Sequence, residues 1–211
     1  MTESKDVRTV LNIGSGNSVM QAPHYEDFYE IKLDVNEAYE PDIVADILEI
    51  DDDWFAENPH YHHAFDAVHM AHVLEHFFVW QNDRIMKAII GFLKPDGMLD
   101  IYVPDILGAA RYTVRNAGAM GLDTVIYRKG NKNEVAIRFH DMLYGYPYNE
   151  NVWMGHHQGF DMRKLVRTVR PYFKHAYQIN RGSDWELGVV AIVEDADWHM
   201  ELFTFKDEDN D

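Results

Sequence analysis

Cysteine is absent from this sequence of 211 residues, which excludes disulfide bonds and thiolate metal sites and is compatible with a reducing cytoplasm. Long hydrophobic runs are absent too: no apolar stretch reaches the length of a membrane span, and no basic and apolar leader opens the chain. We therefore expect a cytoplasmic protein that has no membrane partner.

Positive charge is scarce, since 19 Lys and Arg residues against 36 Asp and Glu residues give a formal net charge of −17 at pH 7. A surface this acidic repels phosphate backbones, so we expect no nucleic-acid partner. Basic residues are concentrated between Arg163 and Lys174, at a spacing typical of the solvated face of a helix. The length suits one α/β domain, residues 1–211, with an acidic tail at Lys206–Asp211.

Short apolar runs predict β-strands, and helical patterns lie between several of them. This alternation favours a mostly parallel sheet with helices on both faces. The helical patterns are Gln81–Phe92, which stops at the turn Lys94–Gly97, and Asp161–Tyr172, whose first residue would cap it. The last two apolar runs are too close in the sequence for a crossover, so they should form an antiparallel hairpin. The runs are Thr9–Ile13, Tyr29–Leu33, Ile43–Ala45, Phe65–Ala71, Met98–Val103, Ala176–Asn180 and Leu187–Val193.

The first of these strands leads directly into Gly14-Ser15-Gly16, and the second ends at Asp34. Glycines let the backbone approach a ligand, and a carboxylate about 20 residues further on accepts hydrogen bonds from ribose hydroxyls. A dinucleotide site would need a third glycine at position 19, where this chain has Val19. The pattern therefore favours a ribose-bearing cofactor without a pyrophosphate, of which S-adenosylmethionine is the common example. A simple strand-ending turn is the alternative.

Glycine or polar residues also follow the later parallel strands. Ligands in open α/β sheets bind beyond the carboxyl ends of the strands, which here are followed by Asp34, Asp46, His72 and Asp105. Asp34 matches a ribose diol, whereas Asp46 would accept from an adenine amino group beside the backbone N–H of Ile47. For any one of these carboxylates, a helix cap or a solvated loop acid is the alternative.

Several motifs together carry a family resemblance. The chain resembles the class I, Rossmann-type S-adenosylmethionine-dependent methyltransferases, and in particular the small stand-alone members with a tyrosine-rich segment and a His-x-x-Gly-Phe block. The matching segments are LNIGSGN (Leu11–Asn17), KLDVNE (Lys32–Glu37), PDIVADILEI (Pro41–Ile50), FDAVHMAHVLEHF (Phe65–Phe77), LKPDGMLDIYVPD (Leu93–Asp105) and LYGYPYNENVWMGHHQGFD (Leu143–Asp161).

The resemblance implies an α/β fold: a seven-stranded, mostly parallel Rossmann-like sheet with helices on both faces and an antiparallel last strand. It also implies methyl transfer from S-adenosylmethionine to a small-molecule acceptor, such as a sugar-like hydroxyl or an amine. The residues that it places around the cofactor are Asn12, Gly14, Ser15, Gly16, Asp34, Asp46, Ile47, Ala71 and His72.

The chain departs from the family pattern at two places. The usual double glycine of the turn after Gln81–Phe92 is Asp96-Gly97 here, which suits the turn if only Gly97 adopts a positive φ. The segment Ser18–Asp27 contains Pro23 and aromatic residues, so it predicts at most one or two helical turns.

Residues 108–159 read as an irregular insertion, rich in Gly, Tyr and His, and we expect an ordered loop that contacts the acceptor. Tyr112, Tyr144 and Trp153 are the predicted walls of the acceptor pocket. The loop could also pair with a second copy, giving a homodimer.

Methyl transfer to a hydroxyl or a protonated nitrogen needs a base, and histidine titrates near neutrality. Among the 12 histidines, His157 and His140 are our first candidates, followed by His76 and by the carboxylate Asp105. A packing or surface role is the alternative for each of them.

The sequence His72-Val73-Leu74-Glu75-His76 also has the H-x-x-E-H form of some zinc peptidases. We expect no metal, because the motif directly follows a buried strand and no third ligand follows at a recognisable spacing. A divalent ion held by this segment and a distant histidine (His140, His156 or His157) is the less favoured alternative.

Two other functions remain open at this point. A cofactor-binding module without turnover would keep the glycine and ribose motifs but lose transfer, and an NAD-type oxidoreductase would bind NAD instead of S-adenosylhomocysteine.

Overall fold

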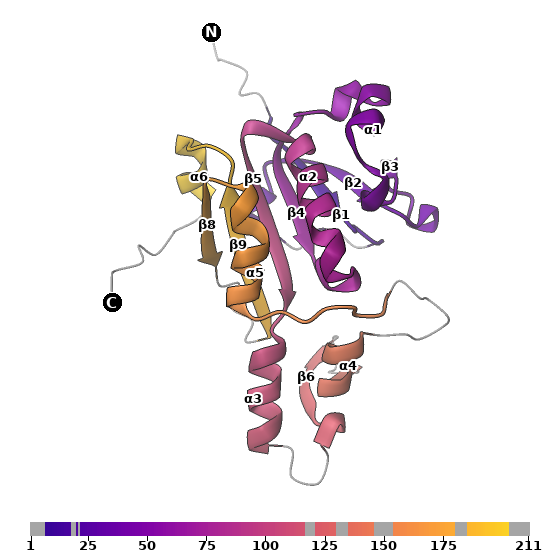
Figure 1. Cartoon of the computed structure of the whole chain (residues 1–211), viewed down its shortest axis with the longest axis vertical. Helices are drawn as coiled ribbons and strands as arrows, with labels where there is room; N and C mark the ends of the chain where they lie inside the picture. Colours follow the sequence, from indigo (N-terminus) through magenta and orange to yellow (C-terminus); the bar gives the residue numbers. More distant parts are fainter. Residues whose placement is uncertain are drawn as a thin grey trace.

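The computed structural model describes residues 7–17, 20, 22–116, 121–129, 135–145, 154–179 and 185–202, so the expected acidic tail and Trp153 lie outside them. A seven-stranded sheet with the order β3-β2-β1-β4-β5-β9-β8 forms the centre of the molecule (Figure 1). Its strands are β1 (Thr9–Ile13), β2 (Tyr29–Asp34), β3 (Ile43–Val44), β4 (Phe65–Ala71), β5 (Leu93–Pro104), β8 (His175–Ile179) and β9 (Glu186–Ile192).

Strand directions confirm the Rossmann-like α/β fold. The pairs β1·β2, β2·β3, β1·β4 and β4·β5 are parallel, whereas β9 pairs antiparallel with β5 and with β8. The predicted hairpin of the last two apolar runs is therefore confirmed as β8–β9. Strand order reverses between β1 and β4, which is where ligands bind in sheets of this kind.

One face of the sheet is covered by α1 (Asp52–Glu57), α2 (Asn82–Phe92) and α5 (Met162–Val169) (Figure 1). The two predicted helices are thus confirmed, and the second continues as a short 3₁₀ turn, Arg170–Tyr172. Their apolar faces are spaced three and four residues apart and are fully buried in the main core. The buried side chains include Ile85, Ile89, Leu165 and Val169.

The opposite face carries a thinner layer. Trp198 of α6 (Asp197–Leu202) and Tyr25 of a single 3₁₀ turn pack there against Val10, Ala67 and Val190. Helical structure therefore covers both faces, and in the described residues of the segment after the glycines (20 and 22–27) it is the short turn Pro23–Tyr25, as the proline predicts. No helix in the described ranges is both long and apolar enough to cross a bilayer.

A polar network is buried within this second layer. Asp100 of β5 is 0% exposed, and its Oδ2 atom accepts hydrogen bonds from His69 Nδ1 at 2.9 Å and His24 Nε2 at 3.1 Å. Burial raises the pKa of Asp100, but the hydrogen bonds with His24 and His69 outweigh it and lower the pKa to about 2. The carboxylate therefore stays ionised in the core.

The predicted turn at Lys94–Gly97 lies inside β5. Phe65 of β4 pairs with Leu93, but Ala67 pairs with Met98, so the intervening residues of β5 bulge out of the sheet. Gly97 does not adopt a positive φ, which corrects our expectation. Glycine suits the position because a Cβ there would lie 2.9 Å from the Lys94 carbonyl oxygen.

Residues 106–116, 121–129 and 135–145 form a small subdomain below the carboxyl ends of the parallel strands (Figure 1). It contains α3 (Ile106–Asn116), an antiparallel hairpin of β6 (Val125–Lys129) and β7 (Val135–Arg138), and α4 (Phe139–Tyr144). The described part of the stretch 108–159, which we expected to be irregular, thus contains regular helices and strands. A separate apolar cluster holds it together, with Ala109, Ile126, Ile137 and Met142 buried.

Candidate functional site

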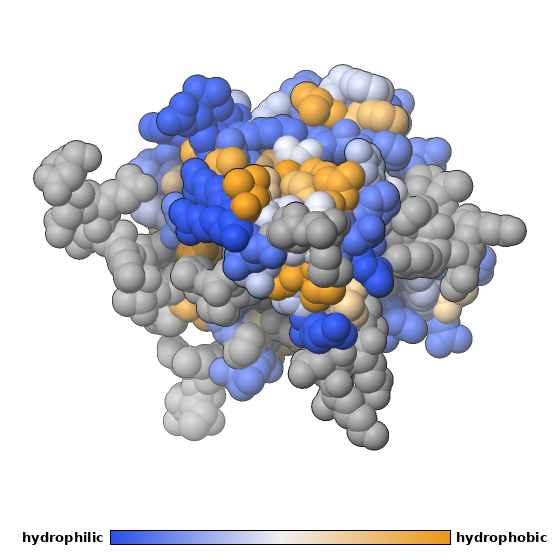
Figure 2. Space-filling view, turned by 90° about the horizontal axis from the view of Figure 1, so that it is seen from below, coloured by the Kyte–Doolittle hydropathy of each residue, from blue (hydrophilic) through white to orange (hydrophobic). Residues whose placement is uncertain are grey.

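A cavity of about 660 Å³ lies between the strand ends and the subdomain. Pockets for small molecules and cofactors commonly have about 300–1,000 Å³. Its walls come from the loops after β1, β2 and β4, from β6, β7 and α4, and from residues 154–157. Seen from below, apolar side chains gather near the middle of this face, with hydrophilic ones around them (Figure 2).

The glycine turn after β1 forms one wall of the cavity. Gly14 and Gly16 both have left-handed backbones, with φ of 67° and 55°. A Cβ on Gly14 would clash with Val73 Cγ2, whereas a Cβ on Gly16 would meet nothing within 4 Å. Gly14 is thus required for packing of the loop, and Gly16 leaves open space beside the backbone where a ligand can lie.

Asp34 ends β2 beside this turn and is 7% exposed. Its Oδ2 atom accepts a hydrogen bond from the Gly16 amide at 2.9 Å, and its Oδ1 atom accepts one from the Asn36 amide at 2.9 Å. These bonds fix the carboxylate at the cavity wall, and each oxygen keeps a lone pair for another donor. The arrangement can receive two adjacent hydroxyl groups.

Two of the expected cofactor residues support the loop after β3 instead of lining the cavity. Asp46 caps a 3₁₀ turn, and its Oδ1 atom accepts a hydrogen bond from the Leu48 amide at 2.9 Å. Ile47 is only 4% exposed, but its neighbour Leu48 reaches the cavity. Asp46 therefore acts as a cap, which was the alternative to its expected contact with adenine.

Three further expected residues also lie behind the cavity wall. Asn12 donates a hydrogen bond from Nδ2 to Glu30 Oε1 at 2.8 Å. Ser15 is 5% exposed, and Ala71 is half-buried at the end of β4. Of the predicted cofactor residues, Gly14, Gly16, Asp34 and His72 line the cavity.

His72 follows β4 in a left-handed conformation, with φ of 57°. Its ring lies between two carboxylates, with Nε2 2.8 Å from Glu186 Oε1 and Nδ1 3.4 Å from Glu75 Oε1. Burial lowers the pKa of His72, but the hydrogen bond with Glu186 and the nearby Glu75 carboxylate outweigh it and raise the pKa to about 9. The ring is therefore protonated near pH 7.

The H-x-x-E-H segment does not form the helix of a zinc peptidase. Leu74–His76 is a single 3₁₀ turn, and His72 precedes it at the strand end. The two histidines of the motif therefore do not share a helical face. The expectation that this is not a peptidase motif agrees with the geometry.

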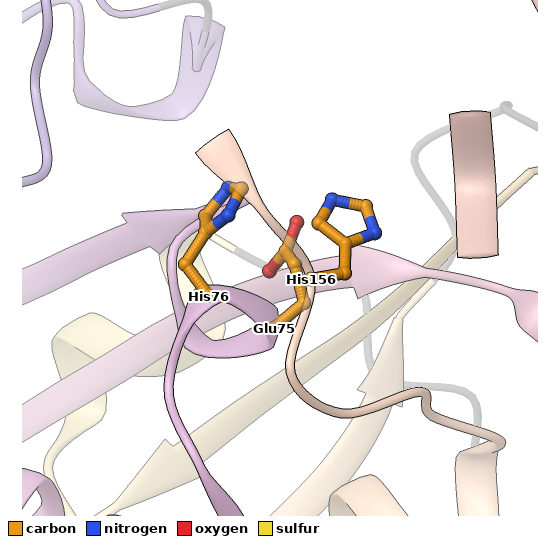
Figure 3. Close-up of side chains that lie close together, drawn as sticks. All are labelled: Glu75, His76 and His156. Carbon is orange, nitrogen blue, oxygen red and sulfur yellow. The ribbon is translucent and has the colours of Figure 1, made fainter. Parts of the chain in front are cut away.

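A different group of three side chains converges at this turn (Figure 3). The ligand atoms that Glu75, His76 and His156 can offer all lie within 4.8 Å of one another. His76 Nδ1 is 3.2 Å from the Gly155 carbonyl oxygen, and His156 Nδ1 is 2.9 Å from the Met142 carbonyl oxygen. Burial lowers the pKa of His156, although Glu75 partly offsets this effect.

The four candidate bases separate into two groups. His157 is exposed at the cavity rim with its ring stacked on Phe78, 4.1 Å between centroids, and His76 also lines the cavity. His140 is exposed on α4 and lies outside the lining. Asp105 lies outside it too, and its Oδ1 atom accepts a hydrogen bond from the Gly108 amide at 2.8 Å, which caps α3.

Two of the three predicted aromatic walls, Tyr112 and Tyr144, do not line the cavity, and Trp153 lies outside the described residues. Tyr127 and Trp185 line the cavity, with their rings stacked at 6.3 Å and 9°. Tyr112 contacts Trp185 from outside the lining, and Tyr144 is 54% exposed. Trp185 could not be found from sequence periodicity, because only the pairing of β8 with β9 brings it to the subdomain.

Comparison with known proteins gives the fold. No family model and no curated protein matches the sequence. Solved structures do match: the PH0226 protein from Pyrococcus horikoshii OT3 is 14% identical, with a TM-score of 0.51 over 90% of this chain and 84% of that chain. The N-methyltransferase NodS from Bradyrhizobium japonicum WM9 is 12% identical, with a TM-score of 0.50 over 88% of this chain and 85% of that chain.

A third structure, the S-adenosylmethionine-dependent methyltransferase SibL, is 15% identical, with a TM-score of 0.52 over 88% of this chain and 50% of that chain. The chain therefore spans about half the length of SibL. The fold of this chain is thus one that methyltransferase structures also have. At such low identity the likeness concerns the fold alone, so the chemistry must be argued from the cavity.

Proposed function

We propose that the protein transfers a methyl group from S-adenosylmethionine to a small-molecule acceptor. The observation that carries this proposal is the pairing of Gly16 with Asp34 at the wall of the cavity. A left-handed glycine with open space beside it and a fixed carboxylate next to it match the ribose end of an adenosyl group. The absence of a third glycine argues against a dinucleotide.

The residues around the glycine turn would hold the cofactor. Asp34 would accept hydrogen bonds from both ribose hydroxyls, while Leu48 and Tyr39 provide apolar surface beside it for a base. Asn12, Ser15, Asp46, Ile47 and Ala71 act from behind the wall by holding its loops. When bound, S-adenosylmethionine supplies an electrophilic methyl group on a sulfonium sulfur, which keeps the electron pair of the broken bond.

The far end of the cavity would hold the acceptor. Tyr127 and Trp185 present stacked rings there, which suit a flat or sugar-like molecule. We assign His157 as the base, since it lines the cavity and can take the proton that the acceptor oxygen or nitrogen loses as its bond to the methyl carbon forms. The chain then contributes mainly positioning and the exclusion of water.

Calorimetry with S-adenosylhomocysteine tests the cofactor half of the proposal. Binding should be measurable with the wild type, and Asp34→Ala should weaken it at least about tenfold, because a hydrogen bond to a charged group contributes about 1.5–3 kcal/mol. Asp52→Ala on the exposed side of α1 is the matched control. Binding of NAD in place of S-adenosylhomocysteine would overturn the proposal in favour of an oxidoreductase.

A turnover assay tests the catalytic half. S-Adenosylhomocysteine release is followed over a panel of small hydroxyl and amine acceptors, and His157→Ala is compared with His140→Ala. Loss of transfer in His157→Ala with unchanged cofactor affinity supports the assigned base. Cofactor binding without release on any acceptor would instead indicate a binding module.

A further inference from the structure

We propose that Glu75, His76 and His156 bind a divalent transition-metal ion, with Zn²⁺ as the representative, at the cavity wall. This goes against the expectation from the sequence that no metal binds. The three side chains come from two distant segments of the chain and point toward one another (Figure 3). All three line the same cavity as the glycine turn.

The buried carboxylate is the first observation that points to a cation. Glu75 is 1% exposed, and within the described ranges neither of its oxygens has a hydrogen-bond partner. The ion-pair partner that the structure shows for Glu75 is His72, whose Nδ1 lies 3.4 Å from Oε1 while its Nε2 makes the shorter contact, at 2.8 Å, with Glu186. A carboxylate taken out of water without hydrogen bonds is costly unless it is paired or coordinates a metal.

The orientation of the two imidazoles is a second, independent observation. His76 Nδ1 and His156 Nδ1 each face a backbone carbonyl oxygen, of Gly155 and Met142. An Nδ1–H that donates to a carbonyl leaves the lone pair on Nε2, which is the arrangement that metal-binding histidines use. In both rings the proton therefore lies on Nδ1, and Nε2 is the nitrogen that can bind a metal ion.

The two segments that carry the ligands are fastened to each other. The Glu75 carbonyl oxygen accepts a hydrogen bond from the His157 amide at 2.8 Å, and the Leu74 carbonyl oxygen accepts one from Gln158 Nε2 at 2.9 Å. Gln158 Nε2 also donates to Asn82 Oδ1 at 2.9 Å, and both amide side chains are buried. The cluster thus lies in a rigid frame, as a preorganised site requires.

The ligand types indicate which ion would bind. Two imidazoles and one carboxylate suit Zn²⁺ and its first-row neighbours, whereas Mg²⁺ and Ca²⁺ prefer oxygen ligands. With bonds of about 2 Å, ligand atoms lie at most about 4 Å apart, so small side-chain rotations would close the set. Three protein ligands leave a position open toward the cavity. If the proposed function holds, an oxygen of the acceptor would occupy that position.

Metal titration tests the proposal without reference to activity. Protein stripped with a chelator is titrated calorimetrically with Zn²⁺, and with Co²⁺ as a spectroscopic probe. We expect one tight site per chain, and a loss of affinity of at least about 100-fold in Glu75→Gln and in His156→Ala. His60→Ala, an exposed histidine in the turn Pro59–Tyr61, should bind as the wild type does.

Thermal stability provides a second readout that a misfolded variant cannot imitate. In the metal-free state Glu75→Gln should melt at the same temperature as the wild type or higher, because it removes a buried charge that accepts no hydrogen bond, and His72 keeps its shorter contact with Glu186. With Zn²⁺ the order should reverse, because only the wild type gains from the ion. A wild type without a site, or variants that bind Zn²⁺ equally well, would overturn the proposal.

S-Adenosylhomocysteine binding on the same samples separates this proposal from the proposed function. Cofactor binding without Zn²⁺ binding removes the metal site and leaves methyl transfer intact. Zn²⁺ binding without cofactor binding supports the metal site and overturns methyl transfer.

Discussion

At the scale of single residues, Gly16 combines a left-handed backbone with open space beside it. Its φ of 55° lies in the left-handed region, and a side chain there would project into open space beside the cavity. Gly121 in the subdomain has nearly the same φ, 52°, and equally open surroundings, but it does not line the cavity. The two glycines form a matched pair.

We predict that Gly16→Ala weakens S-adenosylhomocysteine binding at least about tenfold, because the methyl group occupies ligand space. Gly121→Ala should leave this affinity unchanged. Both variants should lose about 1 kcal/mol of stability, the cost of a left-handed alanine. Calorimetry and urea unfolding measure the two effects. Equal losses of affinity in both variants would show that strain alone, and not space, determines binding.

Asp100 gives a prediction about pH. Its pKa is lowered in the folded protein to about 2 from an ordinary 3.8, so its contribution is complete above pH 3.8 and is lost as the pH falls toward 2. Between pH 5 and pH 2 the unfolding free energy of the wild type should therefore fall by about 2 kcal/mol more than that of Asp100→Asn. Urea unfolding over this range measures the difference, and parallel pH profiles would contradict it.

At the scale of elements, the cap of α5 is a clean test of local stability. Asp161 Oδ1 accepts a hydrogen bond from the Lys164 amide at 2.7 Å, one of the amides that a helix start otherwise leaves unpaired. Asp161→Ala should lower the unfolding free energy by about 1 kcal/mol. Arg163→Ala, exposed on the same helix, should change it far less. If both substitutions have equal cost, the cap does not stabilise the helix.

Elements whose signal is local could be predicted from the sequence. Buried parallel strands appear as apolar runs, so β1 (Thr9–Ile13) and β4 (Phe65–Ala71) match their predictions residue for residue. The bulge in β5 could not be predicted, because Lys94–Gly97 has ordinary turn chemistry and only pairing with β4 places it within a strand. The subdomain was missed because its core is small and its apolar residues are widely spaced.

The candidate site likewise contains residues that local sequence signals predict and residues that only the fold brings together. Gly16 and Asp34 lie at strand ends, and the sheet topology alone brings strand ends together, so the sequence was sufficient to find them. The proximity of His76 to His156 depends on a chain reversal through the whole subdomain. A contact between residues so far apart in the chain leaves no periodic pattern in the sequence. The sequence therefore suggested a metal ligand set only as one alternative among several.

At the scale of the whole molecule, net charge makes a prediction about partners. With a formal net charge of −17, the chain should repel nucleic acids from every side of its surface. We expect no change in the fluorescence anisotropy of labelled duplex DNA or single-stranded RNA at physiological salt. Binding that weakens as salt is added would contradict this expectation and would indicate a local basic surface.

The subdomain leaves the sheet and returns to it at one place. Asp105, just after β5, forms an isolated parallel bridge with Phe160, and the Ile106 amide donates to the Phe160 carbonyl oxygen at 3.2 Å. The points where the chain leaves the sheet and returns to it are therefore adjacent in the structure. Replacing the residues between them by those of another chain would thus need only two splice junctions, which lie side by side.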